Sequence, residues 1–201
     1  MAQTIIPQIV EIEGCDGTGK TILCRRLAMK YEHDTEIIVE QEPWDTNYRD
    51  ELLFKSRVYG KLGVAAFTLD RVIHWLDTLD KGVKYLISDR YLLSTLVYQC
   101  RNEEDNQFAY YLMRRLRLPL PTYTILLVCE PEVLMQRLSD RGLDKENVYD
   151  PKKLAQITQL QGKYIQTADA NYEKDKIMVV NTSERTPQNV YETVQNVIDG
   201  I

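Results

Sequence analysis

The sequence predicts a three-layer α/β fold in which helices cover both faces of a five-stranded parallel sheet. The five short strands are apolar runs without polar alternation, which is typical of strands buried on both faces. Segments with helical periodicity separate these strands, so right-handed crossovers should join one strand to the next. In such sheets ligands bind beyond the carboxyl ends of the strands, and we expect the functional residues there.

The first strand, residues 8–13, ends at a glycine, and a helix over residues 20–31 follows it with Ile22, Leu23, Leu27 and Ala28 on one face. Residues 48–78 are helical in character, with a break or bend near Gly60 and Gly63. The other strands are predicted at residues 36–39, 85–88, 123–129 and 177–181. The other helices are predicted at residues 92–101, 107–118, 131–141, 151–174 and 187–198.

Length and composition indicate one domain, residues 1–201, that binds neither nucleic acid nor membrane. The formal charge of −5 excludes nucleic-acid binding through bulk positive charge. The longest aliphatic run, residues 125–128, is far shorter than the roughly 20 residues of a membrane-spanning helix, and residues 1–7 lack the pattern of a secretory signal. The four cysteines have no metal-ligand spacing and indicate reduced thiols, so we expect a cytoplasmic protein.

Residues 14–21 match the pattern G-x-x-x-x-G-K-[ST] and lie between a predicted strand and a predicted amphipathic helix. The glycines let the backbone curl so that successive amides meet phosphate oxygens at the helix N-terminus. Lys20 supplies a positive charge to the β- and γ-phosphates, and the Thr21 hydroxyl can ligate Mg²⁺. We therefore expect ATP to bind, as phosphoryl donor, at Gly14, Cys15, Asp16, Gly17, Thr18, Gly19, Lys20 and Thr21.

Two further motifs identify a family. One is an F-x-x-x-R helix formed by Phe67 and Arg71, and the other is the D-R-Y-x-x-S-x-x-x-Y-Q segment that begins at Asp89. Together with the phosphate loop, which here reads E-G-x-D-G-x-G-K-T, these motifs resemble the thymidylate kinases over most of the chain. The resemblance implies a P-loop kinase that is a homodimer and acts on small nucleotides, with a short lid over about residues 137–152.

The resemblance also implies roles for the acceptor site. Arg71 and Arg90 would hold the phosphate or base of the acceptor deoxynucleotide, Phe67 would stack on thymine, and Thr95 would face its Watson–Crick edge. Tyr98 would crowd the 2′ position of the sugar. The full set of candidate substrate-binding residues is Glu42, Phe67, Arg71, Arg90, Ser94, Thr95, Tyr98 and Gln99.

Catalytic roles follow from the same resemblance. Asp16 would lie near the acceptor sugar and the metal, and Arg137 and Arg141 would close over the transferring phosphoryl group. Because Gly17 stands where some relatives carry an arginine, the lid would supply that charge. The candidate catalytic residues are Asp16, Lys20, Arg90, Arg137 and Arg141, and the candidate Mg²⁺ ligands are Thr21 and Asp89.

Each of these side chains also has an ordinary structural interpretation. Phe67 could belong to the core, Arg71 and Arg90 could form ion pairs, and Arg137 and Arg141 could be helix-surface charges.

The chain departs from the family pattern after the second strand, where Gln41 stands in place of the arginine of R-E-P members. The sequence Glu42-Pro43-Trp44 is also similar to deoxynucleoside kinases, in which a glutamate deprotonates the sugar hydroxyl. A hydroxyl acceptor needs such a base, whereas a monophosphate with a second pKa of about 6 is already an anion at neutral pH. The main expectation is transfer from ATP to dTMP, with Glu42-assisted nucleoside phosphorylation and a regulatory nucleotide-binding protein as alternatives.

Overall fold

Five parallel strands form one sheet in the order β2-β3-β1-β4-β5 in this computed structural model, which describes residues 6–44, 59–140 and 151–201. The strands are β1 (Gln8–Glu13), β2 (Ile37–Gln41), β3 (Tyr85–Asp89), β4 (Tyr123–Val128) and β5 (Ile177–Asn181). The sheet confirms the predicted number and direction of strands, and each strand lies within two residues of its predicted bounds.

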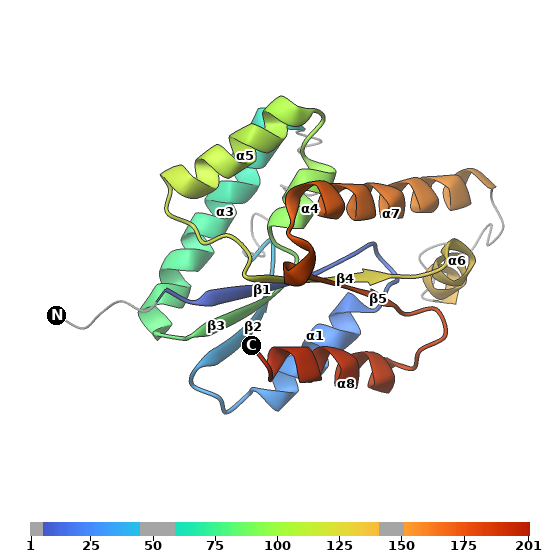
Figure 1. Cartoon of the computed structure of the whole chain (residues 1–201), viewed down its shortest axis with the longest axis horizontal. Helices are drawn as coiled ribbons and strands as arrows, with labels where there is room; N and C mark the ends of the chain where they lie inside the picture. The colour runs from blue at the N-terminus through green and yellow to red at the C-terminus, as the bar shows by residue number, and fades with distance from the viewer. Residues whose placement is uncertain (1–5, 45–58, 141–150) are drawn as a thin grey trace.

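Helices lie on both faces of the sheet (Figure 1). The helices of the described ranges are α1 (Lys20–Lys30), α3 (Gly60–Lys81), α4 (Leu92–Tyr98), α5 (Glu103–Arg115), α6 (Pro131–Asp140), α7 (Pro151–Asn171) and α8 (Pro187–Ile198). Helices α1 and α8 cover one face, and α3, α4, α5 and α7 cover the other (Figure 1). In these ranges no helix has both the length and the apolar character needed to span a bilayer.

Alternation along each strand divides the buried side chains between the two faces. Val10 and Ile12 of β1 pack against Leu27 of α1 and Val194 of α8. Ile9, one residue away, points to the other face and packs with the cluster that contains Met113 of α5. Because both sides of β1 are buried, the phosphate loop that follows it starts from a rigid strand end.

Some element bounds differ from the predictions for local reasons. Helix α5 begins at Glu103 because the side chain of Asn102 accepts a hydrogen bond from the Asp105 amide at 3.0 Å, which is an N-cap. Gly63 does not break α3 but lies buried inside it. On α1 the buried face contains Cys24, whereas Ile22 is 40% exposed, so the predicted apolar face was partly wrong.

Strand register brings three loops to one edge of the sheet. Asp89 at the end of β3 is opposite Ile12 of β1 and also opposite Gln41 of β2. The phosphate loop, the segment after β2 and the Arg90 turn therefore leave the sheet side by side. This edge is where a parallel α/β sheet places its ligands.

Candidate active site

The phosphate loop connects β1 to α1 through backbone conformations that favour glycine. Gly14, Gly17 and Gly19 have φ of 137°, 89° and 103°. A Cβ on Gly14 would lie 2.3 Å from the Leu127 carbonyl oxygen, so the loop can pass this strand only without a side chain. The φ of Gly17 is likewise one that residues with a side chain rarely adopt.

Lys20 is folded back onto this loop. Its Nζ donates to the carbonyl oxygens of Gly14 at 2.7 Å and Cys15 at 2.9 Å, and the residue is 5% exposed. Burial, followed by the positive charge of Arg90, lowers the pKa of Lys20 to about 8. The ammonium group is thus held at the mouth of the loop by two carbonyl oxygens, which a phosphate could replace.

Arg90 lies directly after β3 and spans the gap between β3 and the phosphate loop. Its Nη2 donates to Asp16 Oδ1 at 2.6 Å, while Nη1 donates to Ser94 Oγ at 3.2 Å and to the Tyr164 hydroxyl at 3.0 Å. Although burial lowers the pKa of Arg90, the surrounding acidic groups, Tyr164 first, raise it on balance. The backbone φ of Arg90 is 76°, a left-handed conformation that is uncommon outside glycine.

Two glutamate side chains on β1 hold the chain that follows Arg90. Glu13 Oε1 accepts from the amides of Tyr91 at 2.8 Å and Ser94 at 3.0 Å, and Glu11 Oε2 accepts from the Leu93 amide at 3.2 Å. Both glutamates are fully buried. The N-cap residue of α4, Tyr91, offers no side-chain cap, so the carboxyl oxygens of Glu11 and Glu13 satisfy the first amides of the helix. They also stabilise the turn that places Arg90.

Arg71 and Glu42 form a second buried centre beneath the end of β2. Arg71 Nη2 donates to Glu42 Oε2 at 2.6 Å, and Nε donates to both carboxylate oxygens at 3.0 and 3.1 Å. Nη2 also donates to Thr95 Oγ1 at 3.2 Å. Burial raises the pKa of the Glu42 carboxyl and the Arg71 charge opposes that shift, but a guanidinium keeps its proton. The two side chains therefore form a salt bridge, and Arg71 is partly occupied by the protein itself.

The segment after Glu42 is fixed to α3. The Trp44 amide donates to Asp70 Oδ2 at 3.0 Å, and the indole ring stacks on His74 with the ring centroids 5.4 Å apart. Asp70 and His74 flank Arg71 along α3, so this anchoring keeps Glu42 against the guanidinium.

Other predicted residues are spread around these two centres. Phe67, Tyr98 and Gln99 are half-buried, and Thr95 and Asp89 are almost fully buried. Thr21, at the start of α1, is exposed. The Ser94 hydroxyl donates to Glu13 Oε2 at 2.6 Å, and its role in binding substrate stays a prediction.

Arg137 lies beside the loop but points at protein groups. Its Nη2 donates to the Thr182 carbonyl at 2.7 Å, and Nη1 donates to Thr182 Oγ1 at 3.1 Å and the Gly17 carbonyl at 3.4 Å. Here Arg137 joins α6 and the segment after β5 to the phosphate loop. Arg141 and most of the predicted lid lie outside the described residues.

The donor atoms at the sheet edge fit Mg²⁺. Within residues 6–44, 59–140 and 151–201 no three His, Cys, Asp or Glu side chains gather to form a metal-binding cage. Mg²⁺ in phosphate-transfer sites is bound through one or two protein oxygens, with phosphates and water completing the shell. The exposed Thr21 hydroxyl and the Asp89 carboxylate, whose charge acts on Lys20, provide such a sparse set of oxygens.

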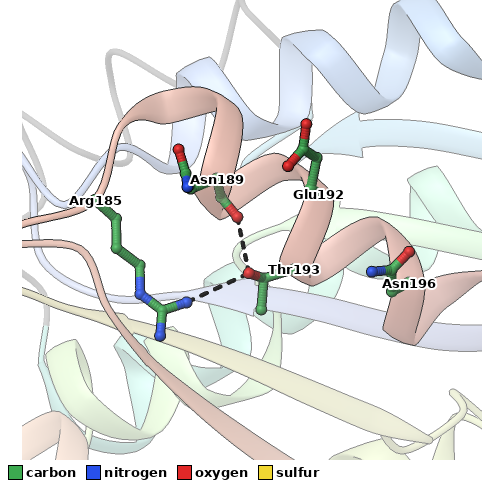
Figure 2. A pocket seen from close by; sticks show the side chains of 5 residues that line it. All are labelled: Arg185, Asn189, Glu192, Thr193 and Asn196. Atoms are coloured by element: carbon green, nitrogen blue, oxygen red, sulfur yellow. Dashed lines mark hydrogen bonds between the residues drawn. The ribbon is translucent and has the colours of Figure 1, made fainter.

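A separate shallow hollow lies along α8 (Figure 2). Arg185 Nη1 donates to Thr193 Oγ1 at 3.3 Å, and this hydroxyl donates to the Asn189 carbonyl at 2.8 Å. Glu192 and Asn196 complete the lining, and all but Thr193 are exposed. None of these residues belongs to the motifs above, and we assign the hollow no role.

Comparison with known proteins assigns this chain to a family. The family model for thymidylate kinase matches residues 12–194. The chain belongs to the thymidylate kinase family. It is accordingly an ATP-dependent nucleoside monophosphate kinase.

Relatives with this family's name match along nearly the whole chain. A probable thymidylate kinase of Sulfolobus acidocaldarius is 30% identical over 192 residues, which are 92% of this chain and 93% of that protein. One of Metallosphaera sedula is 32% identical over 163 residues, covering 80% and 79% of the two chains. A crystal structure of thymidylate kinase from Ehrlichia chaffeensis superposes with a TM-score of 0.65 at 20% identity, covering 96% of this chain and 98% of that one, and supports the fold.

Sequence reasoning missed Glu13 and Tyr164, which contact Arg90 or its turn. Glu11 and Glu13 alternate with Val10 and Ile12 in an apolar strand, and two acids on one face of a buried strand are a signal for internal partners. Tyr164 has no comparable signal, because an aromatic residue on an amphipathic helix is usually part of the core.

Proposed function

We propose that this kinase transfers the γ-phosphoryl group of ATP to the phosphate of dTMP, giving dTDP and ADP. The observation that carries the proposal is the position of Arg90, which is bonded to Asp16 of the donor loop at 2.6 Å and lies at the end of the strand that leads to the acceptor motif. A guanidinium between two anionic phosphates reduces their repulsion and holds them in line.

On the donor side, the loop amides and Lys20 bind the β- and γ-phosphates. Lys20 exchanges its two carbonyl partners for phosphate oxygens when the triphosphate enters, and the charge then developing on the transferring group faces a cation. Thr21 and Asp89 would hold Mg²⁺, which would supply further charge neutralisation at these phosphates.

On the acceptor side, Arg90 orients the dTMP phosphate, which needs no general base because it is already an anion. The base of dTMP lies toward α3 and α4, where Phe67 stacks and Arg71 and Thr95 present hydrogen-bonding groups. Gln99 Oε1 is buried and accepts no hydrogen bond within the described ranges, so it is an acceptor that a base N–H would satisfy. Tyr98 limits space at the sugar.

The salt bridge between Arg71 and Glu42 argues against the nucleoside kinase alternative. Both Glu42 oxygens accept hydrogen bonds from Arg71, and Glu42 is 5% exposed. A general base needs an accessible lone pair directed at the hydroxyl of the acceptor. Glu42 acts here as the counter-ion that fixes Arg71.

Gln41 removes one cation from the acceptor side, so the lid must contribute more. We assign closure over the phosphoryl group to Arg137 and Arg141 within a lid of about residues 137–152, in a single domain of residues 1–201. Arg49 and Lys55, the other cations near this segment in sequence, lie outside the described residues.

A row of exposed apolar side chains on α3 supports a homodimer. Leu62, Leu69, Ile73 and Leu76 are 69%, 61%, 44% and 59% exposed, and spacings of seven, four and three residues return to one face of a helix. A continuous apolar stripe of this kind is typical of a protein interface. We assign it to a second copy of the chain.

The four cysteines are buried and form no disulfide, which supports a reducing, cytoplasmic compartment.

A coupled assay for ADP formation, with ATP and a panel of deoxynucleoside monophosphates and deoxynucleosides, tests the proposal. We expect dTMP to give the highest kcat/KM. Faster turnover of thymidine would assign the acceptor site to a hydroxyl, and turnover of none of the acceptors, despite ATP binding, would favour a regulatory protein.

A further inference from the structure

Tyr164 of α7 reaches Arg90 from a helix that carries none of the family motifs. The residue is completely buried, and its hydroxyl lies 3.0 Å from Arg90 Nη1 and 2.9 Å from Ser94 Oγ. Its ring meets the ring of Tyr98 edge to face, with the centroids 5.9 Å apart. A buried hydroxyl with two polar partners is held in one orientation.

Hydrogen-bond chemistry gives this cluster a direction. A guanidinium only donates, so the Tyr164 oxygen accepts from Arg90. Either hydroxyl could donate in the bond between Tyr164 and Ser94, and Tyr164 is the donor when Ser94 gives its own proton to Glu13. Ser94 in turn donates to Glu13 Oε2 at 2.6 Å, which is an acceptor when ionised. The result is one chain of hydrogen bonds from the Arg90 cation through two hydroxyls to a carboxylate.

The rest of Arg90 is less firmly held. Its Nη2 bonds to Asp16, whose side chain is 75% exposed, whereas the Nη1 side faces the buried hydroxyls. An ion pair whose carboxylate is exposed to solvent contributes little to fixing a long side chain. The hydroxyls of Tyr164 and Ser94 therefore hold the Arg90 guanidinium rigidly. A phosphate can compete with Asp16 for the other side of that guanidinium.

Helix α7 is tied to α4 at the same level. Lys163, the neighbour of Tyr164, donates through Nζ to the carbonyl oxygens of Val97 and Cys100 near the end of α4. The Tyr164 hydroxyl is thus placed by the packing of two helices and does not depend on a loop.

From this geometry we propose that Tyr164 is a positioning residue for the phosphoryl transfer, acting through its hydroxyl to fix the Arg90 guanidinium toward the acceptor phosphate. The inference rests on the proposed function, because Arg90 must contact that phosphate. If Arg90 loses this support it keeps its charge but samples other rotamers. The loss of activity should therefore appear in kcat/KM for dTMP and not in KM for ATP.

The test uses the full-length Tyr164→Phe variant, which removes one oxygen and keeps the ring against Tyr98. We expect kcat/KM for dTMP to fall by about tenfold, with KM for ATP unchanged within about twofold. Tyr31→Phe is the matched control. Tyr31 is also buried and its hydroxyl donates to Asp199 at 2.8 Å on the other face of the sheet, so its loss should affect stability without changing dTMP kinetics.

A double-mutant cycle separates positioning from general stability. In an Arg90→Ala background Tyr164→Phe should change kcat/KM for dTMP by less than about twofold, because the group it positions is gone. Ser94→Ala, which breaks the next link, should give the same pattern. Full additivity with Arg90→Ala, unchanged dTMP kinetics in Tyr164→Phe, or an equal rise in KM for ATP would overturn the inference. Since wild type is assayed in parallel, its failure to use dTMP would refute the proposed function instead.

Discussion

Arg90 Nη2 and Asp16 Oδ1 are 2.6 Å apart, although the two residues belong to different loops and lie 74 positions apart in the sequence. The contact places the guanidinium of the proposed acceptor motif against the loop proposed to bind the donor. Because Asp16 is largely exposed, this partner can be exchanged for an anionic ligand, while the buried contacts of Arg90 remain.

Replacing Arg90 with alanine should lower kcat/KM for dTMP by about 10- to 150-fold, the equivalent of one charge-assisted hydrogen bond of roughly 1.5–3 kcal/mol. Arg90→Lys should recover only part of this loss, because an ammonium lacks the planar fork. Steady-state kinetics with dTMP varied at saturating ATP measure both variants. If Arg90→Ala keeps wild-type kinetics, the acceptor phosphate binds elsewhere.

ATP binding should take up protons near the pKa of Lys20. In the free protein that pKa is lowered to about 8, so part of the population is neutral at about pH 8.5, and phosphate oxygens will raise it on binding. Calorimetric titrations in two buffers of different ionisation enthalpy should show more proton uptake at about pH 8.5 than at about pH 7.5. Equal uptake at both pH values would mean that Lys20 keeps its proton throughout.

The buried Glu11 predicts a pH effect on stability. Burial, followed by the charge of Glu13, raises the pKa of Glu11 from 4.5 to about 8, so between these values the folded state binds a proton that the unfolded chain releases. The contribution of Glu11 to the free energy of unfolding is fully present below its unfolded-state pKa of 4.5. It is lost as the pH rises through the folded-state pKa of about 8.

Glu11→Gln keeps an acceptor for the Leu93 amide but cannot ionise. The free energy of unfolding of this variant should therefore rise relative to that of wild type as pH increases from about 5 to about 8. Denaturant unfolding of both proteins across this range measures the difference, and parallel pH curves would contradict the assignment.

If a second copy of the chain covers the apolar stripe on α3, as proposed, Leu69→Glu should turn that dimer into a monomer. A charge in the middle of the apolar stripe on α3 would have to be buried without a partner, which is strongly unfavourable. Met29→Glu on α1 is the control, since Met29 is 76% exposed and lies outside the stripe. Sedimentation velocity at equal protein concentration measures the molecular masses of wild type and of both variants. A Leu69→Glu variant that stays dimeric would place the interface on another surface.

Most of the fold followed from the sequence because its signals are local. The phosphate loop needs glycines at fixed spacing, and the strands are continuous apolar runs, so both could be located without tertiary information. The start of α5 was missed although Asn102 and Asp105 form a local cap, a signal that the apolar periodicity used to place the helix did not include.

The site was only partly predictable because side-chain partners come from distant segments. The resemblance placed Arg71 near the acceptor, but nothing local indicates that Glu42, 29 positions away, occupies its guanidinium. Tyr164 is 74 positions from Arg90 and reaches it only because α7 packs on α4. Such contacts depend on how helices cross the sheet, which periodicity does not encode.

A crystal structure with ADP and dTMP bound together tests the central claim most directly. We expect the dTMP phosphate to contact the Arg90 guanidinium, with Lys20 turned from the Gly14 and Cys15 carbonyl oxygens toward the ADP phosphates. A dTMP phosphate held elsewhere, with Arg90 still bonded only to protein groups, would contradict the account.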